Sequence, residues 1–136
     1  MKEITVDATL ENIDTVTDFV NEVLEAYECS IKVVTQIDIA IDELFSNIAR
    51  YAYVKDGGKA TVQVDKKDDS PFVSIIFKDN GKPYNPLEND DPDITLSADE
   101  REVGGLGIYL VKKSMDDISY VYKDGQNILS IRKNVN

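Results

Sequence analysis

The sequence predicts an α/β fold of the α+β kind: a two-layer sandwich with helices on one face of a mixed, mostly antiparallel sheet. Three observations support this prediction. Two long segments near the N-terminus carry apolar residues at helical spacing, and four later segments are short and strand-like. A third helical pattern divides those later strands into two pairs. The resulting order, β-α-α-β-β-loop-α-β-β, is typical of helices packed on a single sheet.

The N-terminal half begins with a strand over residues 3–8, where charged and apolar residues alternate. The two long helices are expected over residues 10–28 and 31–53. Their apolar stripes are Ile13, Val16, Val20, Val23, Leu24 and Tyr27 in the first, and Val34, Ile37, Ile41, Leu44, Phe45, Ile48 and Ala52 in the second. Turn residues at Asp56-Gly57-Gly58 end this half of the chain.

The C-terminal half begins with two strands, residues 60–64 and 72–77, in a hairpin pattern. Residues 79–103 have no periodicity and hold three of the four prolines. An aperiodic stretch of this length is generally a functional loop, such as a lid, or disordered. After the third helix, the last strands are expected over residues 117–123 and 127–133. Lys123-Asp124-Gly125 supplies the hairpin turn between them.

Length and composition favour one cytoplasmic domain that spans residues 1–136. The single cysteine, Cys29, cannot form an internal disulfide, which favours a reducing compartment. The N-terminal residues lack the apolar run of a signal peptide, and no segment is apolar enough to span a membrane. We therefore expect no membrane association.

The charge and the absent histidines limit the chemistry further. A net charge of −11 disfavours direct binding to nucleic acid. Such charge either aids solubility or faces a basic protein partner. With no histidine, the chain has no imidazole metal site and no Ser-His or Cys-His nucleophile pair. Any catalytic base must be a carboxylate, a lysine or a tyrosine.

The second helix carries Glu43 and Asn47 four residues apart, so their side chains are neighbours. This pair lies either on a solvated face or beneath a cleft. In a cleft, the amide oxygen of Asn47 suits Mg²⁺, which prefers oxygen ligands. Glu43 could then orient or deprotonate a nucleophile. Arg50, one turn further on, could contact phosphate.

Asp79 and Gly81 follow directly after an apolar strand. An acid and a glycine at this point are common turn residues. In a binding site, the Asp79 carboxylate would accept a hydrogen bond from an exocyclic amine, such as N6 of adenine. Gly81 would let a planar ring approach the backbone closely.

The run Gly104-Gly105-Leu106-Gly107 opens the third helix. Glycines at a helix N-terminus let backbone N–H groups crowd around an anion. The run is not a Walker loop, because no Gly-Lys-Ser/Thr follows. Since the aperiodic segment precedes it directly, the paired glycines are a plausible hinge for a lid.

The order of these three motifs resembles the GHKL ATPase superfamily, which has the Bergerat nucleotide-binding fold, over nearly the whole chain. The resemblance implies that Asn47 binds Mg²⁺ and that Glu43 serves catalysis. It also implies that Asp79 with Gly81 binds adenine. Gly105 and Gly107, with Leu106 between them, would contact the phosphates. They would border an ATP lid formed by about residues 84–103.

Two segments look like those of bacterial anti-sigma factor serine/threonine kinases. They are Asp79-Asn80-Gly81-Lys82-Pro83-Tyr84-Asn85-Pro86, and Gly104–Val111 with Arg101-Glu102-Val103 before its glycines. That resemblance implies phosphorylation of a serine on a small antagonist protein, of the STAS type, and regulation of a sigma factor. Dimerisation is common in this group, so a homodimer is among the expected assemblies.

Two residues depart from the family pattern. Pro83 stands where many relatives have a second glycine. A threonine often follows the final hairpin glycine and helps to hold adenine, but here the sequence is Gly125-Gln126-Asn127, so no such role is assigned.

Three other functions fit the same motifs. A non-catalytic module could bind ATP and sequester a partner without transferring phosphate. The catalytic module of a sensor histidine kinase would carry the same pocket, although the absent histidine argues against it. A simple ATP hydrolase is the third alternative.

Overall fold

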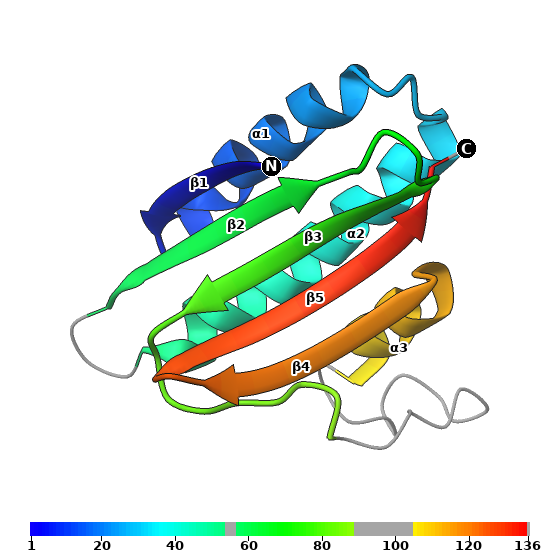
Figure 1. The fold of residues 1–136 in the computed structure, drawn as a ribbon. Coiled ribbons are helices and arrows are strands. Elements are labelled where there is room, and N and C mark those ends of the chain that lie inside the picture. The colour runs from blue at the N-terminus through cyan, green and yellow to red at the C-terminus, as the bar shows by residue number, and fades with distance from the viewer. Residues whose placement is uncertain (54–56, 89–104, 136) are drawn as a thin grey trace.

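A five-stranded sheet forms one layer of the computed structural model, which describes residues 1–53, 57–88 and 105–135 (Figure 1). The strand order is β1-β2-β3-β5-β4, and all four neighbouring pairs are antiparallel. The prediction of a mostly antiparallel sheet is therefore confirmed, and no parallel pair occurs among the described strands. The strands are β1 Lys2–Asp7, β2 Lys59–Asp65, β3 Phe72–Asp79, β4 Asp117–Lys123 and β5 Gln126–Asn134.

Among the described residues, three α-helices form the second layer, all on the same face of the sheet, with α2 between α1 and α3 (Figure 1). They are α1 Ile13–Glu25, α2 Ile31–Asn47 and α3 Gly105–Ser114. The predicted arrangement of helices on one face is thus confirmed. None of the helices in the described ranges is both long and apolar enough to cross a membrane.

Both long helices are shorter than their apolar spacing predicts. A 3₁₀ turn, Leu10–Asn12, precedes α1, and Glu28 takes a left-handed conformation (φ 54°) that interrupts the helical path before α2. The Ser30 side chain then caps α2 by accepting a hydrogen bond from the Val33 backbone N–H. At its other end α2 passes into a π-helical turn, Ile48–Ala52, of the kind that is frequent at functional sites.

The core lies between the two layers. Alternate residues of β3 point toward the helices, and the strand register aligns Val62, Phe77 and Leu129 as one row and Val64, Ile75 and Ile131 as another. Each large apolar side chain buried in this way stabilises the fold by about 1.5–3 kcal/mol. The helices contribute chiefly Val16, Val20, Leu24, Ile37, Ile41, Leu44, Phe45 and Val111.

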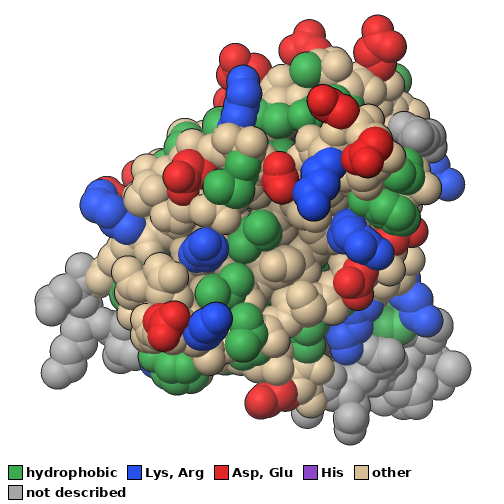
Figure 2. Space-filling model, in the orientation of Figure 1, with side chains coloured by type: hydrophobic (Ala, Val, Ile, Leu, Met, Phe, Trp, Pro, Cys, Tyr) green, Lys and Arg blue, Asp and Glu red, His purple; other side chains and the backbone are tan. Residues whose placement is uncertain are grey.

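The opposite face of the sheet carries no helix in the described part of the chain. Figure 2 shows that hydrophobic side chains and charges of both signs are interspersed on it. At one end of the sheet, β4 and β5 are joined by a tight turn at Asp124 and Gly125, within the predicted hairpin turn Lys123-Asp124-Gly125. Asp124 and Gly125 both have positive φ (54° and 79°), which is the geometry that Asp-Gly favours.

Candidate functional site

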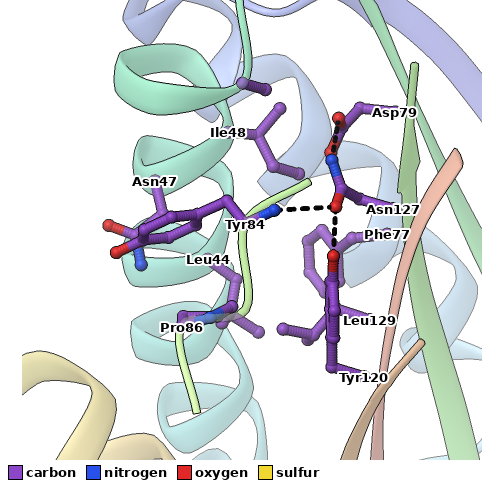
Figure 3. A pocket seen from close by; sticks show the side chains of 11 residues that line it. Leu44, Asn47, Ile48, Phe77, Asp79, Tyr84, Pro86, Tyr120, Asn127 and Leu129 are labelled. Carbon is purple, nitrogen blue, oxygen red and sulfur yellow. Dashed lines mark hydrogen bonds between the residues drawn. The ribbon is translucent and has the colours of Figure 1, made fainter. Parts of the chain in front are cut away.

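A pocket lies between the C-terminal half of α2 and the ends of β3, β4 and β5 (Figure 3). It contains about 390 Å³ of space, part of which is open to solvent. Apolar side chains with a few polar groups line it, as is typical of small-molecule sites. The lining residues are Leu44, Asn47, Ile48, Ala52, Phe77, Asp79, Tyr84, Pro86, Tyr120, Asn127 and Leu129. Asn47 and Asp79, which sequence reasoning singled out separately, therefore line one pocket.

Asp79 is the last residue of β3 and is only 4% exposed. Its Oδ1 accepts two hydrogen bonds of 2.9 Å, one from the backbone N–H of Gly81 and one from the side-chain amide of Asn127. Among the described residues, no donor is bonded to its Oδ2. Burial raises the pKa of Asp79, while the bonds from Asn127 and Gly81 lower it. The second oxygen is thus an acceptor available to a ligand in the pocket.

Gly81 fits where no other residue would. A Cβ at this position would overlap the backbone carbonyl of Ala52, at the end of the π-helical turn. The same carbonyl accepts a hydrogen bond of 2.9 Å from the Lys82 N–H. Gly81 is therefore required for close packing between two backbone segments that frame the pocket. Its contact with a ligand remains a prediction.

We expect Gly81→Ala to destabilise the fold by about 1–3 kcal/mol, the usual cost of forcing extra atoms into a packed site. The obstructing atoms belong to the backbone and cannot swing away. Urea denaturation would measure the change. An unfolding free energy equal to that of the unmodified protein would contradict this explanation of the glycine.

Glu43 and Asn47 lie one helical turn apart near the end of α2. Glu43 is half-buried. Burial raises the pKa of its carboxyl, the charge of Asp42 raises it further, and Arg50 and a hydrogen bond from Asn47 lower it. Because a carboxylate only accepts, Asn47 donates through Nδ2. Its Oδ1 is then left as an acceptor or metal ligand beside the pocket. Arg50 is exposed, and its contact with phosphate remains a prediction.

At Gly107, the glycine run that opens α3 lies close to Glu43 on α2. This residue lies in the first turn of α3, so close to Glu43 that a Cβ would overlap the Glu43 carboxylate. Gly105 and Leu106 are helical, as predicted, whereas Gly104 lies outside the described residues. Of the proposed lid, only residues 84–88 are described.

Asn127 is a pocket residue that sequence reasoning missed. It lies opposite Asp79 in the β3–β5 register and is 5% exposed. The family pattern has a threonine after the hairpin glycine that helps to hold adenine, and the absence of a threonine here predicts no such role for this position. A usable signal was present, since Asn127 alternates with the buried Leu129 and Ile131 on the helix-covered face of β5. A polar residue in such a series requires internal hydrogen bonds, which here come from the pocket.

Tyr84 was also missed as a pocket residue. Its backbone N–H donates to Asn127 Oδ1 over 3.1 Å (Figure 3), and its ring lies against Tyr51 with centroids 5.4 Å apart. Burial raises the pKa of the Tyr84 hydroxyl, and the nearby Tyr51 and Glu43 raise it further. The ring thus extends from the Asp79 side of the pocket toward Glu43.

The described residues contain no group of three or more His, Cys, Asp or Glu side chains placed to hold a metal ion. The amide oxygen of Asn47 is a hard oxygen donor, of the kind that Mg²⁺ accepts.

Comparison with known structures supports the fold. The RsbU and RsbW domains of Rv1364c from Mycobacterium tuberculosis match with a TM-score of 0.64 and 14% identity, over 99% of this chain and 33% of that one. The histidine kinase domain of the blue-light activated histidine kinase EL346 from Erythrobacter litoralis matches with a TM-score of 0.51 and 14% identity, over 76% and 45% of the two chains. At these identities the likeness concerns the fold alone.

Comparison with known sequences is more specific. The chain is 30% identical over 95 residues to the serine/threonine-protein kinase BtrW of Bordetella bronchiseptica and 32% identical over 95 residues to the serine-protein kinase RsbW of Bacillus mycoides. These alignments cover 70% and 67% of this chain, but 66% and 58% of the relatives, which is less than two thirds of their length.

The family model of the histidine kinase-like ATPase domain matches residues 6–133, almost the entire chain. Its range includes every predicted site residue from Glu43 to Gly107. The resemblance to GHKL ATPases is thereby confirmed, and the chain belongs to the histidine kinase-like ATPase domain family.

Proposed function

We propose that the pocket binds ATP, with adenine against Asp79 and the phosphates toward Asn47 and the start of α3. The observation that carries the proposal is the Oδ2 of a buried carboxylate in a largely apolar pocket, to which no described residue donates a hydrogen bond. This oxygen would accept a hydrogen bond from the exocyclic amine of adenine. The apolar lining, including Leu44, Ile48 and Leu129, suits the faces of a planar ring.

Asn47 would hold Mg²⁺ with the phosphate oxygens. Its Oδ1 is left over once Nδ2 donates to Glu43, and an amide oxygen is the kind of ligand that Mg²⁺ accepts. When bound, the ion would neutralise negative charge on the phosphates. Arg50 and the backbone of Gly105-Leu106-Gly107 are the further candidates for phosphate contacts.

Glu43 would be the general base of a protein serine kinase. Its half-buried carboxyl has a raised pKa, which is expected of a group tuned for proton transfer. It would accept the proton of a serine hydroxyl while the hydroxyl oxygen takes the γ-phosphoryl group and ADP is released. BtrW and RsbW are named as serine kinases, which supports this reaction over hydrolysis.

The substrate would be a small antagonist protein of the STAS type, in a circuit that controls a sigma factor. We take residues 1–136 as a single ATP-binding domain with a lid at about residues 84–103, acting in the cytoplasm as a monomer or homodimer.

The test is transfer of labelled γ-phosphate from Mg-ATP to serine-bearing antagonist proteins encoded beside this protein's gene. Phosphoserine on one of them supports the kinase. Tight binding of ATP and partner without phosphoserine would identify a sequestering module, and phosphate release without a protein substrate would identify a hydrolase.

Gly107→Ala tests the position of Glu43 when phosphoryl transfer is measured at saturating Mg-ATP, because saturation removes any effect of the substitution on phosphate binding. The added methyl group would displace the Glu43 carboxylate, a flexible end that can move without disturbing the fold. We expect the unfolding free energy to stay within about 1 kcal/mol of the original, since alanine is also the better helix former. Phosphoryl transfer should fall at least about tenfold. Unchanged transfer in steady-state assays would mean that the position of Glu43 is unimportant.

A further inference from the structure

Asn127 has every hydrogen-bonding group of its side chain engaged. Nδ2 donates to Asp79 Oδ1 over 2.9 Å and to the backbone carbonyl of Lys82 over 2.8 Å. Oδ1 accepts from the Tyr84 N–H over 3.1 Å and from the Tyr120 hydroxyl (Figure 3). A primary amide has two donor hydrogens and one acceptor oxygen with two lone pairs, so these four bonds use its full capacity.

The partners permit one orientation of this amide. The Asp79 carboxylate and the Lys82 carbonyl can only accept, and the Tyr84 N–H can only donate. A reversed amide would turn its oxygen toward two acceptors and its NH₂ group toward a donor. The contacts therefore hold the Asn127 side chain in one rotamer, 5% exposed at the back of the pocket.

We propose that Asn127 is a positioning residue of the nucleotide site, which fixes the Asp79 carboxylate and ties it to the backbone of Lys82–Tyr84. The inference rests on the proposed function. The bond from Asn127 commits Oδ1 of Asp79 to the protein and leaves Oδ2 for the ligand. The same amide holds the segment that carries the Tyr84 ring. Selectivity for an amine-bearing base thus depends on a residue that need not touch the base.

Without the amide, the Gly81 N–H would be the one remaining partner of Asp79 Oδ1 among the described residues, and the carboxylate could rotate. A rotated carboxylate no longer presents a defined acceptor, so adenine loses its advantage over a base with a carbonyl oxygen at the same place. ATP affinity should fall about 10- to 100-fold, the range expected when a charged group loses a hydrogen bond. GTP affinity, which gains nothing from that acceptor, should change less than about threefold.

The experiment measures binding of Mg-ATP and Mg-GTP by calorimetry to the full chain and to Asn127→Leu, which keeps the branched shape but removes all four bonds. Asn127→Ala is the second variant, in case leucine is not accommodated. Asn21→Leu is the matched control, because Asn21 also donates its amide to a carboxylate, Asp38 Oδ1 at 3.0 Å, but on α1 away from the pocket. Thermal melts establish that each variant is folded.

The proposal predicts that the ATP-to-GTP affinity ratio falls at least about threefold in the folded Asn127 variants and is unchanged in Asn21→Leu. A ratio equal to that of the unmodified protein would overturn it. A parallel loss of ATP and GTP binding would also overturn it, because that pattern indicates a purely structural role. If the unmodified protein fails to prefer ATP, the proposed function itself is wrong, so the two failures are distinguishable.

Discussion

Asp79→Asn is expected to lower ATP affinity by about 10- to 100-fold while leaving the fold intact. The substituted amide can keep Oδ1 bonded to the Gly81 N–H and to Asn127, as in the original structure. Its NH₂ group would replace Oδ2 and present a donor to the donor amine of adenine. The lost bond to a charged acceptor accounts for the magnitude. Calorimetric titration with Mg-ATP measures it.

The Asp79→Asn substitution, although it weakens ATP binding, should not lower the free energy of unfolding. Burial raises the folded-state pKa of Asp79 above its unfolded value, so the folded protein binds this proton more tightly. The contribution of Asp79 to stability is therefore greatest below the unfolded pKa and declines as pH rises through the folded pKa. Removing the charge should leave stability at pH 7.5 equal or higher, as urea denaturation would measure. Loss of both ATP binding and stability would indicate that Asp79 is structural.

Glu43→Gln is expected to lower phosphoryl transfer by about 10²- to 10⁴-fold, the usual effect of losing a general base. ATP affinity should change little, because the glutamine carbonyl can still accept the Asn47 hydrogen bond that orients Oδ1 of that residue. Single-turnover transfer and calorimetric binding, measured on the same protein, separate the two quantities. If ATP binding is lost as well, Glu43 supports the site structurally and another group must be the base.

The pH dependence of phosphoryl transfer tests the same role of Glu43. Transfer should increase as pH rises through the raised pKa of Glu43, since only the ionised form accepts a proton. Asp42→Asn is the matched variant: Asp42 is exposed, and its charge is one cause of the raised pKa. Its removal should move the midpoint of the profile to lower pH without changing the maximum rate. An unmoved midpoint would assign the profile to a different group.

The sequence predicted the elements well because their patterns are local. Alternation identified the strands, apolar spacing identified the helices, and Asp124-Gly125 identified the hairpin turn. The π-helical turn at Ile48–Ala52 could not be predicted, since apolar spacing continues through it as in an α-helix. Its Ala52 carbonyl explains Gly81 through packing, a reason that no local pattern contains.

Within the candidate site, the local patterns singled out Asp79 and Asn47 one at a time, and it was the resemblance to GHKL ATPases that predicted one nucleotide site for both. That relation depends on how α2 packs across the ends of β3 and β5, which is a long-range property. Asn127 was missed for the same reason. Its place opposite Asp79 follows from the β3–β5 register, and register is set by the whole sheet rather than by the residues around Gly125.

The central claim is that an amine-bearing purine nucleotide binds against Asp79. Calorimetric titration of the unmodified protein with ATP and with GTP, each with and without Mg²⁺, tests it most directly. We predict saturable binding of one ATP per chain, strengthened by Mg²⁺ and at least about tenfold tighter than GTP, because GTP carries an acceptor oxygen where ATP carries its amine. Absence of ATP binding, or equal affinity for the two nucleotides, would contradict the claim.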